Sequence, residues 1–233
     1  MPGTAEKRDP MQPHSKTQRP QTNPPEPRWS IVLALLAAGA LYLALPEPLS
    51  VGPHWLLLVI VLALLVPTWL TQHRDPPLIN MALGHTLSGV ITGFMLWSLV
   101  MLIRGLFAHR ETPAVTLRSG ALLWLTNVLV FASWYWRLDA GGPHGRAKRL
   151  GHRADAFLFP QMTLEGGEAK EKSGMPWSPK FIDYLFLAFN TSTALSPTDT
   201  PVLSRWAKAL LMVQSLISLS ITLVLVGRAV NIM

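Results

Sequence analysis

Five long stretches of the sequence contain no charged residue, and they constrain the fold more than any other feature. They lie between Arg28 and Glu47, Glu47 and Arg74, Asp75 and Arg104, Arg118 and Arg137, and Lys208 and Arg228. An α-helix needs about 20 mostly apolar residues to cross the ~30 Å hydrocarbon core of a bilayer. We therefore predict five membrane-spanning helices, over residues 29–45, 53–71, 80–103, 119–136 and 208–227.

The composition favours a membrane protein over the other broad classes. Charged residues make up 14% of the 233-residue chain, whereas a soluble domain averages about 25%. The net charge of +7 comes without any motif that reads DNA or RNA, and basic residues flanking membrane spans account for it. We expect the lipid bilayer as a partner and no nucleic acid.

Tryptophans mark several of the predicted span ends. Trp29, Trp55 and Trp69 lie at the ends of the first two spans, and 134-WYW-136 closes the fourth. Amphipathic aromatic rings are favoured at the level of the lipid headgroups. Trp97 and Trp124 lie inside predicted spans, so we expect them to pack against neighbouring helices.

Two polar segments divide the chain into regions. Residues 1–28 are rich in proline and basic residues and poor in apolar ones, which predicts a disordered tail because little surface can be buried. A four-helix transmembrane region over 29–138 is followed by a polar, glycine-rich loop over 139–180 and a C-terminal region over 181–233. The loop contains an apolar island, 156-AFLFPQM-162, which we expect to dock against the helices rather than lie on the membrane surface.

Basic residues predict the orientation of the chain. With five spans and a cytoplasmic N-terminus, fourteen of the seventeen Lys and Arg residues in the tail and loops up to residue 180 fall on the cytoplasmic side. Cytoplasmic loops carry an excess of Lys and Arg. We therefore expect a multi-pass protein of the cell (inner) membrane with its N-terminus in the cytoplasm.

The C-terminal region begins with a short apolar segment, 181-FIDYLFLAFNTSTAL-195. As a helix it would cover about 22 Å at 1.5 Å per residue, too little to cross a bilayer. The polar turn 196-SPTDT-200 follows, and 201–227 returns as a long apolar helix. This pattern predicts a re-entrant element, so the expected fold class is an all-α membrane protein with about five transmembrane helices plus one short re-entrant or pore-like helix.

The order of short helix, Thr-rich turn, Asp, basic residues and long apolar helix resembles the pore region of two-transmembrane potassium channels. Here it reads 183-DYLFLAFNTSTALSPTDTPVLSRWAKALL-211. The chain is also similar to a family of uncharacterised bacterial multi-pass integral membrane proteins with a pore-like C-terminus. The segments that carry this likeness are 133-SWYWRLDAGGP-143, 157-FLFPQM-162, 182-IDYLFLAF-189 and 196-SPTDT-200. The resemblance implies a membrane location and a channel-like hairpin but brings no established activity.

The hairpin departs from the channel pattern at its filter. A potassium filter directs successive backbone carbonyls into the pore and uses glycines that tolerate positive φ. This chain has no glycine between Gly174 and Gly227, and Pro197 stands in the turn. We therefore expect any conductance to discriminate poorly between potassium and sodium.

Two hypotheses describe the polar residues of the hairpin. In the first, they line a wet conduit of a channel-like or transport-related protein, and a homo-oligomer encloses the pore. The pore-like candidates are Asn190, Thr191, Thr193, Ser196, Thr198, Asp199, Gln214 and Ser218. In the second, the chain is a non-conducting membrane scaffold or interaction protein, Ser196 or Thr198 caps the last helix, and Gln214 and Ser218 join helices by hydrogen bonds.

Other residues are expected to serve packing. Gly89 and Gly93 have the spacing that lets a neighbouring helix approach closely, and Asn127 is expected to form an interhelical hydrogen bond. Asp139 and Asp183 are expected to pair with Arg137 and Lys180, respectively. The chain has no cysteine and no nucleophile–base pair, so we expect neither an enzyme nor a cofactor or metal site.

Overall fold

The structure of the protein is a computed structural model that describes residues 27–71, 78–108, 112–147, 154–163, 177–193 and 199–230. Nearly all of the predicted tail, and the candidates Ser196 and Thr198, lie outside these described residues.

Helices make up nearly all of the described ordered elements, and no β-sheet forms among the described residues. The α-helices are α1 (Trp29–Leu43), α2 (Trp55–Leu70), α3 (Leu78–Phe107), α4 (Pro113–Leu138), α5 (Gly142–Ala147), α6 (Phe181–Thr193) and α7 (Arg205–Val230). Three short 3-10 helices are η1 (Glu47–Leu49), η2 (Asp139–Gly141) and η3 (Pro160–Met162).

Three of these helices are long and apolar enough to cross a membrane. The first is α3, over Leu78–Leu106, and the last is α7, over Arg205–Val230. The second begins with α4 and continues through η2 and α5, over Pro113–Ala147. The apolar helices α1 and α2 have 15 and 16 residues, about 22–24 Å at 1.5 Å per residue, which is shorter than the ~30 Å hydrocarbon core. The structure thus fits an all-α membrane protein with three long and two shorter apolar helices.

Local sequence signals explain where the longest helices begin and end. Thr112 caps α4 by accepting a hydrogen bond from the Val115 N–H at 3.5 Å, and Pro113 occupies the first turn, where its missing N–H is not needed. α4 ends where Ala140, Gly141 and Gly142 adopt φ of 53°, 76° and 74°. Glycine reaches positive φ at low cost, so the two glycines turn the chain away from the helix axis.

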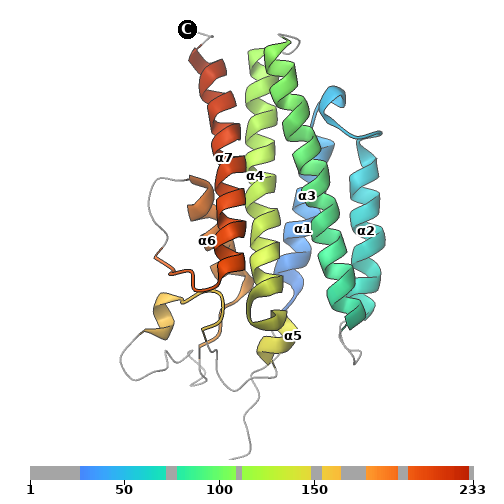
Figure 1. Ribbon diagram of the computed structural model, residues 1–233. Helices are drawn as coiled ribbons and strands as arrows, with labels where there is room; N and C mark the ends of the chain where they lie inside the picture. The colour runs from blue at the N-terminus through green and yellow to red at the C-terminus, as the bar shows by residue number, and fades with distance from the viewer. Residues whose placement is uncertain are drawn as a thin grey trace, which may run out of the picture.

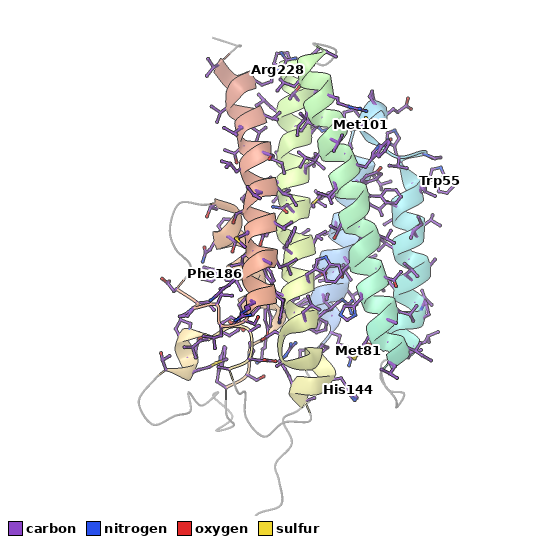
Figure 2. The ribbon with its side chains drawn as sticks, in the orientation of Figure 1. Trp55, Met81, Met101, His144, Phe186 and Arg228 are labelled. Atoms are coloured by element: carbon purple, nitrogen blue, oxygen red, sulfur yellow. The ribbon has the colours of Figure 1, made fainter. Side chains whose placement is uncertain are left out.

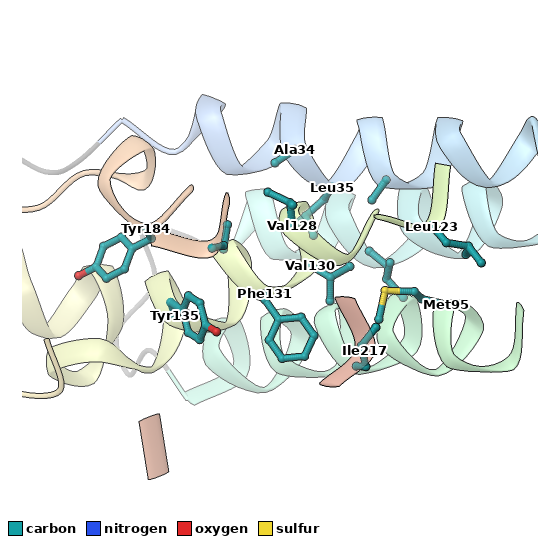
Figure 3. Packing of buried hydrophobic residues seen from close by; sticks show 14 of the residues in the cluster. Ala34, Leu35, Met95, Leu123, Val128, Val130, Phe131, Tyr135, Tyr184 and Ile217 are labelled. Carbon is teal, nitrogen blue, oxygen red and sulfur yellow. The ribbon is translucent and has the colours of Figure 1, made fainter. Parts of the chain in front are cut away.

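The helices form an elongated bundle around α4 (Figure 1), which packs against α1, α3, α6 and α7. Buried apolar side chains of α4, including Val128 and Phe131, meet Leu35 of α1, Met95 of α3 and Ile217 of α7 (Figure 3). This cluster is continuous along the bundle. Each of α1, α3, α6 and α7 therefore buries one face against α4, whereas α2 packs against α1 and α3.

The opposite faces are apolar and exposed. Figure 2 shows Trp55 and Phe186 on the outside of the bundle, and their side chains are 57% and 58% exposed. On α7, Leu216, Leu219 and Leu223 are also exposed. An apolar outer surface of this kind suits contact with lipid.

Tryptophan positions agree with the sequence analysis only in part. Trp29, Trp55 and Trp69 are exposed at helix ends, as expected of rings at headgroup level. Trp136 is buried, so the interfacial role predicted for 134-WYW-136 is wrong for that ring. Trp97 is 48% exposed, which contradicts the packing role predicted for it.

The predicted close approach at Gly89 and Gly93 is absent from the described part of the chain. A Cβ at Gly89 would lie 4.0 Å from Trp134, and one at Gly93 would meet nothing within 4 Å. Between α4 and α7, Gly120 is a tight position, since a Cβ there would lie 2.5 Å from a side-chain carbon of Leu225. The α4–α7 contact therefore depends on a glycine that the spacing did not single out.

Candidate functional site

The candidate pore-like residues that the structure describes fall on three segments. Asn190, Thr191 and Thr193 lie in the last turn of α6, which stops part-way along α7 (Figure 1). Asp199 lies in the segment that leads to α7. Gln214 and Ser218 lie one turn apart on α7, on the face that α4 and α6 cover.

Gln214 is fully buried and joins three helices. Its side-chain amide donates hydrogen bonds to the Ala188 carbonyl oxygen and the Ser192 hydroxyl, both on α6 and both at 2.8 Å. Its carbonyl oxygen Oε1 accepts a hydrogen bond from the Tyr135 hydroxyl of α4. The amide nitrogen and the amide oxygen of Gln214 are thus both hydrogen-bonded to other helices of the chain.

Ser192 is the second centre of the cluster. Its hydroxyl accepts from the Asn127 amide at 3.4 Å, and its backbone carbonyl accepts from the Trp124 indole N–H at 3.3 Å and from the Ser218 hydroxyl. We call this set the α4–α6–α7 polar network, and its members are Trp124, Asn127, Tyr135, Ser192, Gln214 and Ser218. Buried polar groups that satisfy one another fix the helices in register.

The structure confirms one prediction about this network and shows what the sequence analysis missed. Asn127 forms the expected interhelical hydrogen bonds. Tyr135 and Ser192 were not among the candidates, although both are central. Ser192 lies within the polar stretch that carries the other candidates, four residues after Ala188 on the buried face of α6.

The other described candidates make local contacts. The Thr191 hydroxyl donates to the Leu187 carbonyl oxygen at 2.8 Å, and the Thr193 hydroxyl donates to the Asn190 carbonyl oxygen at 2.9 Å. Asp199 is exposed. The structure therefore separates the candidates into a buried interhelical group and a group at the tip and exit of α6.

An apolar groove lies beside α6, between α1 and α4. Its volume is about 760 Å³. The residues that line it are Ala37, Ala40, Leu41, Leu125, Val128, Leu129, Ile182, Leu185, Phe186 and Phe189. A groove with only hydrocarbon side chains offers water no hydrogen-bond partner, so it suits an acyl chain better than an ion.

A second buried polar cluster lies where α4 ends. The Asp139 carboxylate is fully buried, accepts a hydrogen bond from the Tyr184 hydroxyl at 2.6 Å and another from the Ala156 N–H at 3.0 Å. The prediction that Asp139 pairs with Arg137 is therefore wrong. Arg146 lies over the Tyr184 ring at 5.2 Å and donates to the Trp136 carbonyl oxygen at 2.8 Å.

This cluster anchors the segment that contains the apolar island. Phe157 is fully buried among the rings of Tyr135, Tyr184 and Trp206, with centroid distances of 5.4, 6.2 and 6.3 Å. Backbone hydrogen bonds join Leu158 to Pro201 at 2.9 Å and Leu203 to Ala156 at 2.8 Å. The predicted docking of the island is confirmed.

At the start of α6, Asp183 interacts with Lys180 through the backbone. The Asp183 carboxylate accepts a hydrogen bond from the Lys180 N–H at 2.7 Å. A side chain in the first turn that reaches back in this way satisfies an N–H that has no partner within the helix. The contact stabilises the beginning of the short helix.

Among the described residues, no group of three or more His, Cys, Asp or Glu side chains comes together in a way that could hold a metal ion. The comparisons with known proteins add no further constraint: no family model, curated protein or solved structure matches the chain.

Proposed function

We propose that the protein is an integral membrane scaffold or interaction protein whose C-terminal hairpin packs the bundle and does not conduct. The α4–α6–α7 polar network carries this proposal. A conduit needs polar groups that remain open to water, whereas Gln214 and Ser218 are 0% and 1% exposed and bind other helices of the same chain.

The surroundings of α6 support the same conclusion. Non-helical backbone at membrane depth is tolerated when it is buried in protein as well as when it lines a wet cavity. The groove beside α6 is lined by apolar residues alone, and the α6 face that carries Ser192 is turned toward α4 and α7. The re-entrant element is thus stabilised by protein contacts.

Five crossings, an inner-membrane location and a cytoplasmic N-terminus complete the proposal. The shorter helix α1 begins at the exposed Trp29, and α2 has exposed tryptophans near both ends, Trp55 and Trp69. α1 lies beside α4, and α2 lies beside α3. Helices of about 22–24 Å can cross where the bilayer thins locally or flanking residues reach the interface. The excess of basic residues in the tail and in 139–180 supports the orientation.

A channel-like or transport-related role is the second candidate, and one observation favours it. α6 ends part-way along α7, and Asn190 and Thr193 are partly exposed at its tip. In a homo-oligomer that conducts, these tips would face a shared axis.

Ion flux in proteoliposomes separates the two roles. The full chain is reconstituted, its insertion is checked by protease protection, and potassium and sodium fluxes are compared with those of empty liposomes. We expect no flux above empty liposomes. A flux that falls in Asn190→Ala or Thr193→Ala, in protein whose thermal stability is unchanged, would establish the channel-like role instead.

A further inference from the structure

A small cavity lies where α1 begins, α2 ends, α3 begins and α4 ends. Figure 1 shows these four helix ends together at one end of the bundle. The volume of the cavity is about 40 Å³, room for roughly three water molecules or one small oxyanion. The polar side chains that line it are Arg28, Thr68, Asn80 and Arg137, and no carboxylate is among the described residues of its lining.

Arg137 is the unusual member of this lining. Its side chain is only 9% exposed, and its Nε has no hydrogen-bond partner among the described residues. The described residues also place no carboxylate within ion-pair distance of it. Its guanidinium carbon lies 5.7 Å from the centre of the Trp136 ring, a contact that favours a cation but neutralises no charge.

The surrounding helices hold this guanidinium in place. A Cβ at Gly84 of α3 would lie 1.9 Å from Arg137 Nη1, so only glycine leaves room for the charged group there. A guanidinium does not lose its proton in proteins, and a buried charge without an ionic partner is strongly unfavourable. Among the described residues, therefore, no group completes the site around the Arg137 guanidinium.

Arg28 brings a second guanidinium to the same cavity, and Asn80 orients it. Arg28 Nη1 donates to Asn80 Oδ1 at 3.4 Å, while Asn80 Nδ2 donates to the Thr68 carbonyl oxygen at 2.5 Å and to Thr71 Oγ1 at 3.3 Å. The amide is thus fixed by the end of α2. The Asn80 oxygen thus holds the Arg28 guanidinium at the cavity.

We propose that this cavity binds a phosphate-type oxyanion, held by Arg137 and Arg28. Guanidinium groups pair with phosphate oxygens through two parallel N–H bonds, and such charge-assisted bonds are the strongest that these side chains form. The anion is the phosphate of a lipid headgroup or a free phosphate ion, since the cavity lies where helices begin and end. The proposal is independent of the hairpin, because no residue of α6 or α7 lines the cavity.

The test uses the full chain with Arg137→Gln, and Arg118→Gln is the matched control, an exposed arginine near the opposite end of α4. Thermal unfolding is followed in neutral detergent during titration with inorganic phosphate. It is then followed in nanodiscs of phosphatidylcholine with and without phosphatidylglycerol. We expect one of these anions to raise the Tm of the wild type and the control, and Arg137→Gln to weaken its apparent affinity by at least about tenfold.

The two arms identify the source of the anion. Stabilisation by inorganic phosphate in detergent indicates a free ion, and stabilisation by phosphatidylglycerol alone indicates a lipid headgroup. If Arg137→Gln does not fold, Arg28→Gln, which changes a partly exposed side chain, must show the same loss of response. Equal responses of wild type, control and both cavity variants, or no response of the wild type to either anion, would overturn the proposal.

Discussion

Replacing Gln214 with methionine tests how much the polar network contributes to stability. Methionine has a similar length and no amide, so the change removes two donated bonds to α6 and one accepted from Tyr135. Interhelical hydrogen bonds in membranes contribute about 0.6 kcal/mol each, with a maximum near 1.7, so three bonds amount to roughly 2 kcal/mol. The Tyr135 hydroxyl, left buried without this partner, adds about 1–3 kcal/mol. We expect Gln214→Met to lower the free energy of unfolding by about 3–5 kcal/mol.

The measurement is reversible unfolding in mixed micelles of a mild detergent and dodecyl sulfate. Ser220→Ala is the matched control on the same helix, because Ser220 is partly exposed and its hydroxyl donates to the Leu216 carbonyl oxygen of α7 itself. It should change stability by less than about 0.5 kcal/mol. Adding Tyr135→Phe to Gln214→Met removes the unpaired hydroxyl and should recover about 1 kcal/mol. If Gln214→Met stays within about 0.5 kcal/mol of the wild type, the network is not what holds α6 and α7 to α4.

Three further perturbations test other parts of the structure. Tyr184→Phe removes the hydroxyl that binds the buried Asp139 carboxylate. The free energy of unfolding should fall by about 1.5–3 kcal/mol, and proteases should cleave more readily within 154–163. Unchanged protease sensitivity would contradict the anchoring role. Gly120→Ala should lower the free energy of unfolding by about 1–3 kcal/mol, because its Cβ would overlap Leu225 of α7. Gly93→Ala, where a Cβ would meet nothing within 4 Å, should be neutral or stabilising by up to about 1 kcal/mol. Equal effects of the two substitutions would contradict the close α4–α7 contact. In this cysteine-free chain, Thr163→Cys should be labelled from the cytoplasmic side and Ser50→Cys from the outside, and the reverse pattern would invert the proposed orientation.

The helices could be predicted from the sequence because hydrocarbon imposes a length and excludes charge. Each predicted span overlaps one apolar helix, and the short segment 181–195 corresponds to α6. The helix ends were predicted less well: the span predicted over 119–136 belongs to α4, which begins six residues earlier, at Pro113. The charge-free stretches did not predict how α1 and α2 lie in a bilayer. Such a stretch gives the greatest length that a helix can have and not the residues at which the helix begins and ends.

The partners of polar groups could not be predicted, since they depend on which faces meet. The spacing of Gln214 and Ser218 placed them on one side of a helix, but the same stripe fits a pore and a packed interface equally well. Asp139 shows the same limit: proximity in sequence suggested Arg137, whereas the end of α4 turns the carboxylate toward Tyr184 and Ala156. The spacing of Gly89 and Gly93 likewise did not reveal whether a neighbouring helix packs closely against them.

Water access to the hairpin tests the central claim most directly. Single-cysteine variants at Ser192, Ser218 and Asp199 in the inserted full chain are exposed to a membrane-impermeant thiol reagent from each side. The account predicts rapid reaction at Asp199→Cys, which is exposed, and no reaction at Ser192→Cys or Ser218→Cys, whose parent side chains are 3% and 1% exposed. Reaction at Ser192→Cys and Ser218→Cys at rates close to that of Asp199→Cys, in protein that remains folded, would show a wet lining and contradict the proposal of a packed, non-conducting hairpin.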